Sequence, residues 1–118
     1  MSALVSNTDA VKAHNVQLGI YTLSGSTYTL VAKTGSISVP AGATGVWVTG
    51  NLTTSPSLSS ATTYYLGIVT DNVAVEFWYS TSSSTKVYGQ SATFGAWPAT
   101  FSGQYADFLG QIGILVNY

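Results

Sequence analysis

Apolar and polar residues alternate with a period of two in several short stretches of the chain. Residues 16–21 read VQLGIY, residues 37–39 read ISV, and residues 112–116 read IGILV. Successive side chains of a β-strand point to opposite faces, so this alternation predicts strands with one buried face. No stretch keeps a helical period over three turns. The pattern therefore predicts an all-β chain.

The predicted strands are short and are separated by Gly, Ser, Pro and Asn, a spacing typical of sandwiches and barrels. They cover residues 16–21, 28–33, 37–39, 44–52, 62–69, 73–79, 86–88 and 111–118. Asp71 and Asn72 form a two-residue turn that would join the strands on either side into a hairpin. About eight strands and no helix predict an antiparallel two-sheet β-sandwich of the jelly-roll type.

A length of 118 residues predicts one domain, residues 1–118, with enough buried surface for a single core. There is no Cys, so neither a disulfide framework nor a thiolate metal site can form. Residues 3–5 read as strand directly after the start, and Tyr118 ends the last predicted strand. We expect a module of a longer chain, or a sandwich that a neighbouring chain completes.

Charged residues make up only 6% of the chain, against about 25% in an average soluble domain. The basic residues number three, and the formal net charge is -1. Three Lys cannot neutralise a track of phosphates, and the chain has no basic amphipathic helix, so we expect neither nucleic acid nor a membrane as a partner. A neutral surface rich in Ser, Thr and Tyr suits a chain buried in an assembly, or one that binds a neutral hydroxylated polymer.

Three segments of the chain resemble a known group of modules. Residues 16–23 read VQLGIYTL, residues 30–35 read LVAKTG, and residues 63–71 read TYYLGIVTD. They resemble β-sandwich modules of bacteriophage tail and other virion proteins, which are similar to carbohydrate-binding jelly rolls. The resemblance implies a virion or extracellular location, with a homo-oligomer or other virion proteins as partners. It also implies one more strand before residues 3–6, and the lack of that strand would leave a sheet edge unpaired.

Candidates for catalysis are few. The acidic residues are Asp9, Asp71, Glu76 and Asp107, and the one imidazole is His14. A glycosidase needs two carboxylates across a cleft, and the G-x-S-x-G elbow of serine hydrolases does not occur. Glu76 reads as a solvent-facing strand carboxylate, His14 as an ordinary loop residue, and Asp71 as part of a turn rather than a Ca²⁺ site. The sequence predicts no enzyme, no metal and no cofactor.

Aromatic residues give better material for binding than the charged residues give for catalysis. On the expected hairpin, Tyr65 and Trp78 would point outward if the alternate aliphatic residues fill the core. Together they would form an exposed aromatic platform of the kind that stacks on sugar rings. The alternative is that a second sheet, a subunit or a loop covers them. Trp47 lies between two valines and is expected to be a core or intersheet residue.

A second candidate site is the connection 89–109, which is long for a compact domain. It offers aromatic surface and acceptors for hydroxyl hydrogen bonds. The residues concerned are Gln90, Trp97, Gln104, Tyr105 and Asp107. The alternative is a loop that closes the open end of the sandwich and buries its own aromatic side chains.

Two functions account for the low charge and the aromatic residues. The first is a non-enzymatic virion module, of the tail-fibre or tail-tip type, that binds a host-surface glycan through exposed aromatics. The second is a purely structural virion or filament subunit, such as a capsid decoration protein, whose aromatics contact neighbouring subunits. They differ in whether Trp78 and the 89–109 connection remain open to solvent.

Overall fold

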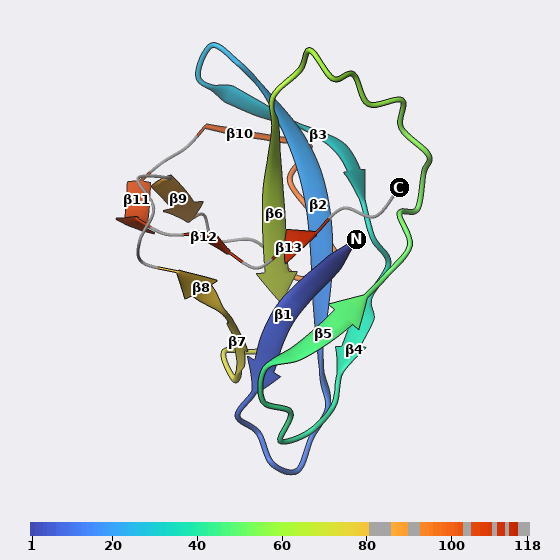
Figure 1. Ribbon diagram of the computed structural model, residues 1–118, viewed down its shortest axis with the longest axis vertical. Coiled ribbons are helices and arrows are strands. Elements are labelled where there is room, and N and C mark those ends of the chain that lie inside the picture. Colours follow the sequence, from blue (N-terminus) through green and yellow to red (C-terminus); the bar gives the residue numbers. More distant parts are fainter. Residues whose placement is uncertain (81–85, 90–92, 103–104, 110, 113, 116–118) are drawn as a thin grey trace.

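The alternating segment 16–21 lies in the longest strand of the protein, β2 (His14–Ser24), in a computed structural model of the chain. The structure describes residues 1–80, 86–89, 93–102, 105–109, 111–112 and 114–115, with side chains for residues 1–78 and 93–100. These residues form strands, turns and loops without a helix (Figure 1). The predicted fold class, an all-β antiparallel two-sheet sandwich, is confirmed.

Two strands are central to the sandwich, one in each sheet. In the first sheet, β1 (Ser2–Asn7) has β5 (Val46–Thr49) on one side and both β7 (Val75–Phe77) and β13 (Ile114–Leu115) on the other. In the second sheet, β2 has β6 (Tyr64–Thr70) on one side, and β3 (Thr27–Lys33) and β4 (Ile37–Val39) on the other. The remaining strand of the second sheet, β10 (Thr100–Ser102), pairs with β3.

Two smaller antiparallel ladders complete the described strands. The first joins β8 (Tyr79–Ser80) to β12 (Gln111–Ile112). The second joins β9 (Lys86–Gly89) to β11 (Tyr105–Leu109). Within the predicted strand at 111–118 the structure describes β12 and β13, and the connection 89–109, expected to lack strands, contains β10 and β11.

The core lies between the two sheets, and alternate residues of the central strands fill it. Ala3 and Val5 of β1 form one buried cluster with Val16, Leu18 and Ile20 of β2. The period of two in residues 16–21 thus reports the buried face correctly. The same register turns Ser2, Leu4 and Ser6 of β1 toward the outer face of the first sheet.

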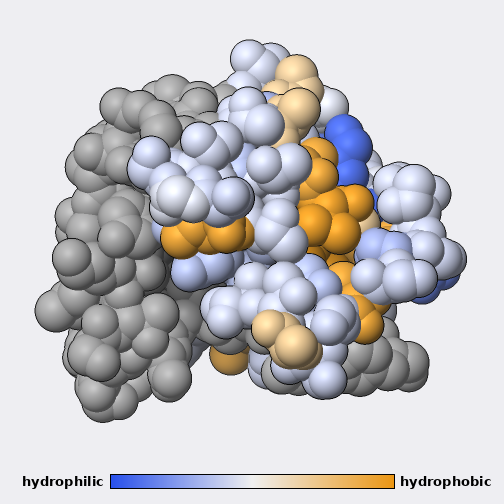
Figure 2. All heavy atoms as spheres, turned by 90° about the horizontal axis from the view of Figure 1, so that it is seen from above, coloured by the Kyte–Doolittle hydropathy of each residue, from blue (hydrophilic) through white to orange (hydrophobic). Residues whose placement is uncertain are grey.

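One end of the sandwich leaves apolar residues accessible. Figure 2 looks onto this end, where the β2–β3 turn and the loop before β6 lie, and shows a band of apolar residues between polar ones. Among the large apolar residues that stay exposed are Leu23 and Leu66. Leu58, from the loop before β6, packs partly buried against the core. The Tyr64 hydroxyl accepts a hydrogen bond from the Ser59 backbone N–H at 2.9 Å and holds this loop in place.

The predicted hairpin of residues 62–69 and 73–79 is wrong. The first of these segments, β6, pairs with β2 in the second sheet, whereas β7 pairs with β1 in the first. The Asp71 carboxylate explains the difference, because it accepts hydrogen bonds from the backbone N–H and side-chain amide of Asn15 at 2.9 and 2.8 Å. Asn72 then turns the chain by accepting the Ala74 N–H at 2.9 Å. The turn is therefore a crossover between the sheets.

The expected unpaired edge at residues 3–6 is also wrong. β1 pairs with β5 on one side and with β7 and β13 on the other, so it is an internal strand. Strands distant in sequence supply these partners, which local patterns cannot show. The strand predicted at 44–52 is shorter than expected, because Gly45 has a positive φ of 57° and ends the extended backbone before β5.

A tryptophan face on the outer side of the first sheet

The candidate site follows from the register of β1. Leu4 lies opposite Trp47 of β5, and Ser6 lies opposite Glu76 of β7. Directly opposed residues of an antiparallel pair share one face of the sheet. Because Leu4 and Ser6 point outward, Trp47 and Glu76 also point outward. This places an indole and a carboxylate on the same outer surface.

Trp47 is half exposed, with 51% of its surface accessible. Its neighbours Val46 and Val48 oppose the buried Val5 and Ala3 and belong to the core side of β5. The expectation that Trp47 is a core or intersheet residue is therefore wrong. The alternation Val-Trp-Val contained the signal, since the two valines and the tryptophan must face opposite ways.

Trp78 reaches the same surface from the other side of β1, and it is 50% exposed. Its backbone N–H donates to the Leu4 carbonyl at 3.0 Å, and its indole Nε1–H donates to the Ser6 hydroxyl at 2.8 Å. The Ser6 hydroxyl also accepts the Gly45 N–H at 2.9 Å. A Cβ built at Gly45 would lie 3.6 Å from Cζ2 of Trp78. The indole thus lies across β1 in a fixed orientation.

We call Leu4, Trp47, Glu76 and Trp78 the tryptophan face. Neighbouring strands lie about 4.8 Å apart, so the backbones that carry the two indoles, on either side of β1, lie about 10 Å apart. Glu76 is exposed and adds an acceptor for hydrogen bonds beside them. Apolar ring surface with a polar rim can bind a flat ligand that offers both C–H bonds and hydroxyl groups. The outward position predicted for Trp78 is confirmed.

Trp97 lies on the opposite side of the molecule, over the outer face of the second sheet. A Cβ built at Gly19 would come within 2.5 Å of its Cζ3 atom, and one at Gly67 within 3.1 Å. These two glycines oppose each other on β2 and β6, so they leave a recess for the indole. The ring stacks on Tyr21 at 5.8 Å between centroids. Its Nε1–H donates to Oε1 of Gln17 at 3.0 Å.

Tyr65 belongs to the same covered surface. Its ring meets Tyr28 edge-on, with 5.0 Å between the centroids. Next to it, the Tyr21 hydroxyl donates to the Pro98 carbonyl at 3.2 Å, and burial raises the pKa of Tyr21 to about 12. Tyr21 and Gln17 therefore fasten residues 93–100 to the second sheet through Trp97 and Pro98, and Tyr65 packs beside them against Tyr28. The predicted shared platform of Tyr65 and Trp78 is wrong, because β6 and β7 belong to different sheets.

For the other predicted ligand residues, the structure describes no side chain. Gln90 and Gln104 lie outside the described residues. Tyr105 and Asp107 lie in β11, of which the structure describes the backbone. Their proposed roles stay predictions. Within residues 93–100, the connection covers the outer face of the second sheet rather than the end of the sandwich.

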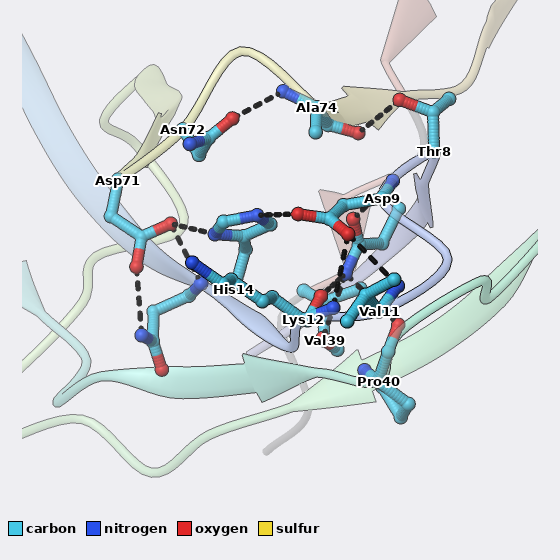
Figure 3. A network of polar contacts seen from close by, with 12 residues as sticks. Thr8, Asp9, Val11, Lys12, His14, Val39, Pro40, Asp71, Asn72 and Ala74 are labelled. Atoms are coloured by element: carbon cyan, nitrogen blue, oxygen red, sulfur yellow. Dashed lines mark hydrogen bonds and ion pairs between the residues drawn. The ribbon is translucent and has the colours of Figure 1, made fainter.

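His14 and the two carboxylates of Asp9 and Asp71 gather at the crossover (Figure 3). His14 lies between two carboxylates, with Nε2 at 3.1 Å from Oδ2 of Asp9 and Nδ1 at 3.5 Å from Oδ1 of Asp71. Backbone hydrogen bonds from Val11 and Lys12, followed by the contact with His14, lower the pKa of Asp9. The described residues contain no group of three or more His, Asp or Glu arranged to hold a metal. The cluster ties the β1–β2 loop to the crossover.

Comparisons with known proteins leave the family open. No family model matches the chain, no curated protein matches it, and no solved structure matches it. The described part of the chain contains no helix long and apolar enough to span a bilayer. The resemblance to phage tail modules stays a prediction.

Proposed function

We propose that the protein is a non-enzymatic module that binds a neutral glycan through the tryptophan face. The observation that carries the proposal is the pair of half-exposed indoles, Trp47 and Trp78, on one surface of one sheet. Trp78 is held by the hydrogen bond to Ser6, so its exposed ring is already oriented before any ligand arrives. A preoriented side chain loses less entropy on binding than a mobile one.

The chemistry of the surface favours a sugar over a charged ligand. Glu76 is the one charged side chain of the tryptophan face, and residues 34–70 contain no charged residue. Each ring contact is expected to contribute about 1 kcal/mol, comparable to other aromatic contacts. Single sites would then bind in the millimolar range and gain strength by repetition in an assembly. Because charge contributes little, salt should barely change the affinity.

The resemblance to virion modules supports a tail-fibre or tail-tip role, in a virion or extracellular setting, toward a host-surface glycan. The second candidate is a purely structural virion or filament subunit. One observation favours it, because Trp47 lies on β5 next to an edge of the first sheet, where a neighbouring subunit could cover it. Large exposed apolar groups commonly mark a partner surface. The two candidates differ in whether the indoles stay accessible in the assembled particle.

A glycan array followed by titration calorimetry tests the proposal. Wild-type protein should bind at least one neutral glycan, and Trp47→Ala and Trp78→Ala should each weaken that binding at least fivefold. Val73→Ala is the matched control, because Val73 is 97% exposed and lies outside the tryptophan face. This variant should bind as wild type does. Failure to bind any glycan, or binding that neither tryptophan variant changes, would contradict the proposal and favour the structural subunit.

A further inference from the structure

The edge of β5 that faces away from β1 presents outward-pointing backbone N–H and C=O groups. Met1 and Gly50 exchange both backbone hydrogen bonds, at 2.8 and 2.9 Å. In an antiparallel ladder, bonded and non-bonded pairs alternate. Ala3 with Val48 is therefore the next bonded pair, and Leu4 with Trp47 is non-bonded. The N–H and C=O groups of Trp47, and likewise those of Thr49, point away from β1.

No strand among the described residues pairs with this edge. The nearest strand of the other sheet, β4, lies across an open groove of about 510 Å³, whose lining includes Ile37, Pro40, Val46 and Trp47. The Thr34–Leu52 bridge joins the two sheets beyond one end of the groove. Natural edge strands are usually guarded by Lys, Pro or a bulge. β5 reads Val-Trp-Val-Thr and has none of these guards.

The hydrogen-bonding groups on this edge of β5 are complementary to those on the same edge of a second copy. Trp47 and Thr49 offer N–H and C=O groups in equal number and at alternate positions, so a two-fold rotation brings donors opposite acceptors. The uncharged residues 34–70 include β4 and β5, and the net charge is -1, so two copies meet here without strong repulsion. We propose that β5 pairs antiparallel with β5 of a second copy and joins the two first sheets into one continuous sheet.

This pairing would double the tryptophan face, a consequence that rests on the proposed function. Opposed residues of an antiparallel pair share a face, so Trp47 of both copies would lie on the same outer surface near the two-fold axis. The aromatic surface would then run from Trp78 of one copy to Trp78 of the other. Such a surface suits an extended neutral polysaccharide rather than a single sugar, because both halves bind one chain.

Sedimentation and amide hydrogen exchange on three proteins test the pairing. Thr49→Pro removes an outward N–H, and Thr49→Val removes only the hydroxyl that contacts Ser2 at 2.7 Å. Wild type and Thr49→Val should be dimers with a slowly exchanging Trp47 amide. Thr49→Pro should be a monomer in which the Trp47 amide exchanges at least tenfold faster, while the Val48 amide stays protected and reports an intact fold.

The pairing is overturned if wild type sediments as a monomer, or if Thr49→Pro keeps the wild-type assembly. It is also overturned if the Trp47 amide exchanges equally fast in wild type and Thr49→Pro. Binding of a short neutral oligosaccharide tests the proposed function independently of the dimer. Thr49→Pro should bind it with wild-type affinity per chain, whereas Trp78→Ala should remain a dimer and bind it at least fivefold more weakly. If wild type is a dimer but binds no glycan, the β5 pairing is supported and the proposed function is contradicted.

Discussion

The outer faces of the two sheets use tryptophan in opposite ways. On the second sheet, Gly19 and Gly67 leave a recess that Trp97 fills, and Gln17 satisfies its indole N–H. On the first sheet, Trp47 and Trp78 lie on the surface and stay half exposed. Tryptophan therefore holds residues 93–100 against the second sheet, but on the first sheet it remains accessible to a ligand or partner. The glycines beneath Trp97 mark the difference, because no glycine of the described residues leaves such a recess beneath Trp47.

The largest expected effect is on stability, and it separates the two faces. Trp97→Ala removes a packed ring and its hydrogen bond, so we expect a loss of about 3 kcal/mol in the free energy of unfolding. Trp47→Ala removes a half-exposed ring and should cost no more than about 1 kcal/mol. Urea denaturation of both variants measures the contrast. Equal losses would show that Trp47 contributes to packing as Trp97 does, and would contradict the difference between the two outer faces.

A smaller effect tests the recess itself. At Gly19, a Cβ would come within 2.5 Å of the Trp97 ring, whereas at Gly35 a Cβ would meet nothing within 4 Å. Gly19→Ala should therefore destabilise the fold by about 1–3 kcal/mol through overpacking, and Gly35→Ala should change it by less than about 0.5 kcal/mol. Thermal unfolding of the two alanine variants compares them directly. If Gly19→Ala is as stable as Gly35→Ala, Trp97 does not depend on the recess.

The smallest effect concerns the crossover, where two carboxylates accept hydrogen bonds from neighbouring loops and strands. The folded pKa of Asp9 lies below its ordinary value, so the carboxylate stabilises the fold above its unfolded pKa of about 4. This stabilisation is lost as the pH falls through the folded pKa. Urea midpoints measured from pH 6 downward should decline below about pH 4 in wild type and decline less in Asp9→Asn. An identical decline in both proteins would show that the Asp9 carboxylate does not stabilise the fold.

Local patterns in the sequence predicted what depends on neighbouring residues. The alternation in residues 16–21 identified the buried face of β2, and the strand pattern predicted the sandwich. The outward position of Trp78 also followed from the alternation with its neighbours. Trp47 was predicted to be a core or intersheet residue, although its alternation with Val46 and Val48 indicates the outward position that the structure shows.

Contacts between distant residues were beyond these patterns. The Asp71–Asn15 hydrogen bonds turn an apparent hairpin into a crossover, and nothing in residues 62–79 alone reveals them. The same holds for Trp97, whose recess is made of glycines on β2 and β6. The separation of Tyr65 from Trp78 and the pairing of the two indoles across β1 are consequences of this topology, so the sequence alone pointed to the wrong platform.

The central claim is that a neutral glycan binds the tryptophan face and does not contact Trp97 on the outer face of the second sheet. The chain has three Trp, so its indole N–H groups give three signals that proton–nitrogen correlation spectra can follow during a titration. We predict that an oligosaccharide that binds on the glycan array shifts the Trp47 and Trp78 signals and leaves the Trp97 signal in place. A shift confined to Trp97, or no shift of Trp47 and Trp78 at saturation, would contradict the claim.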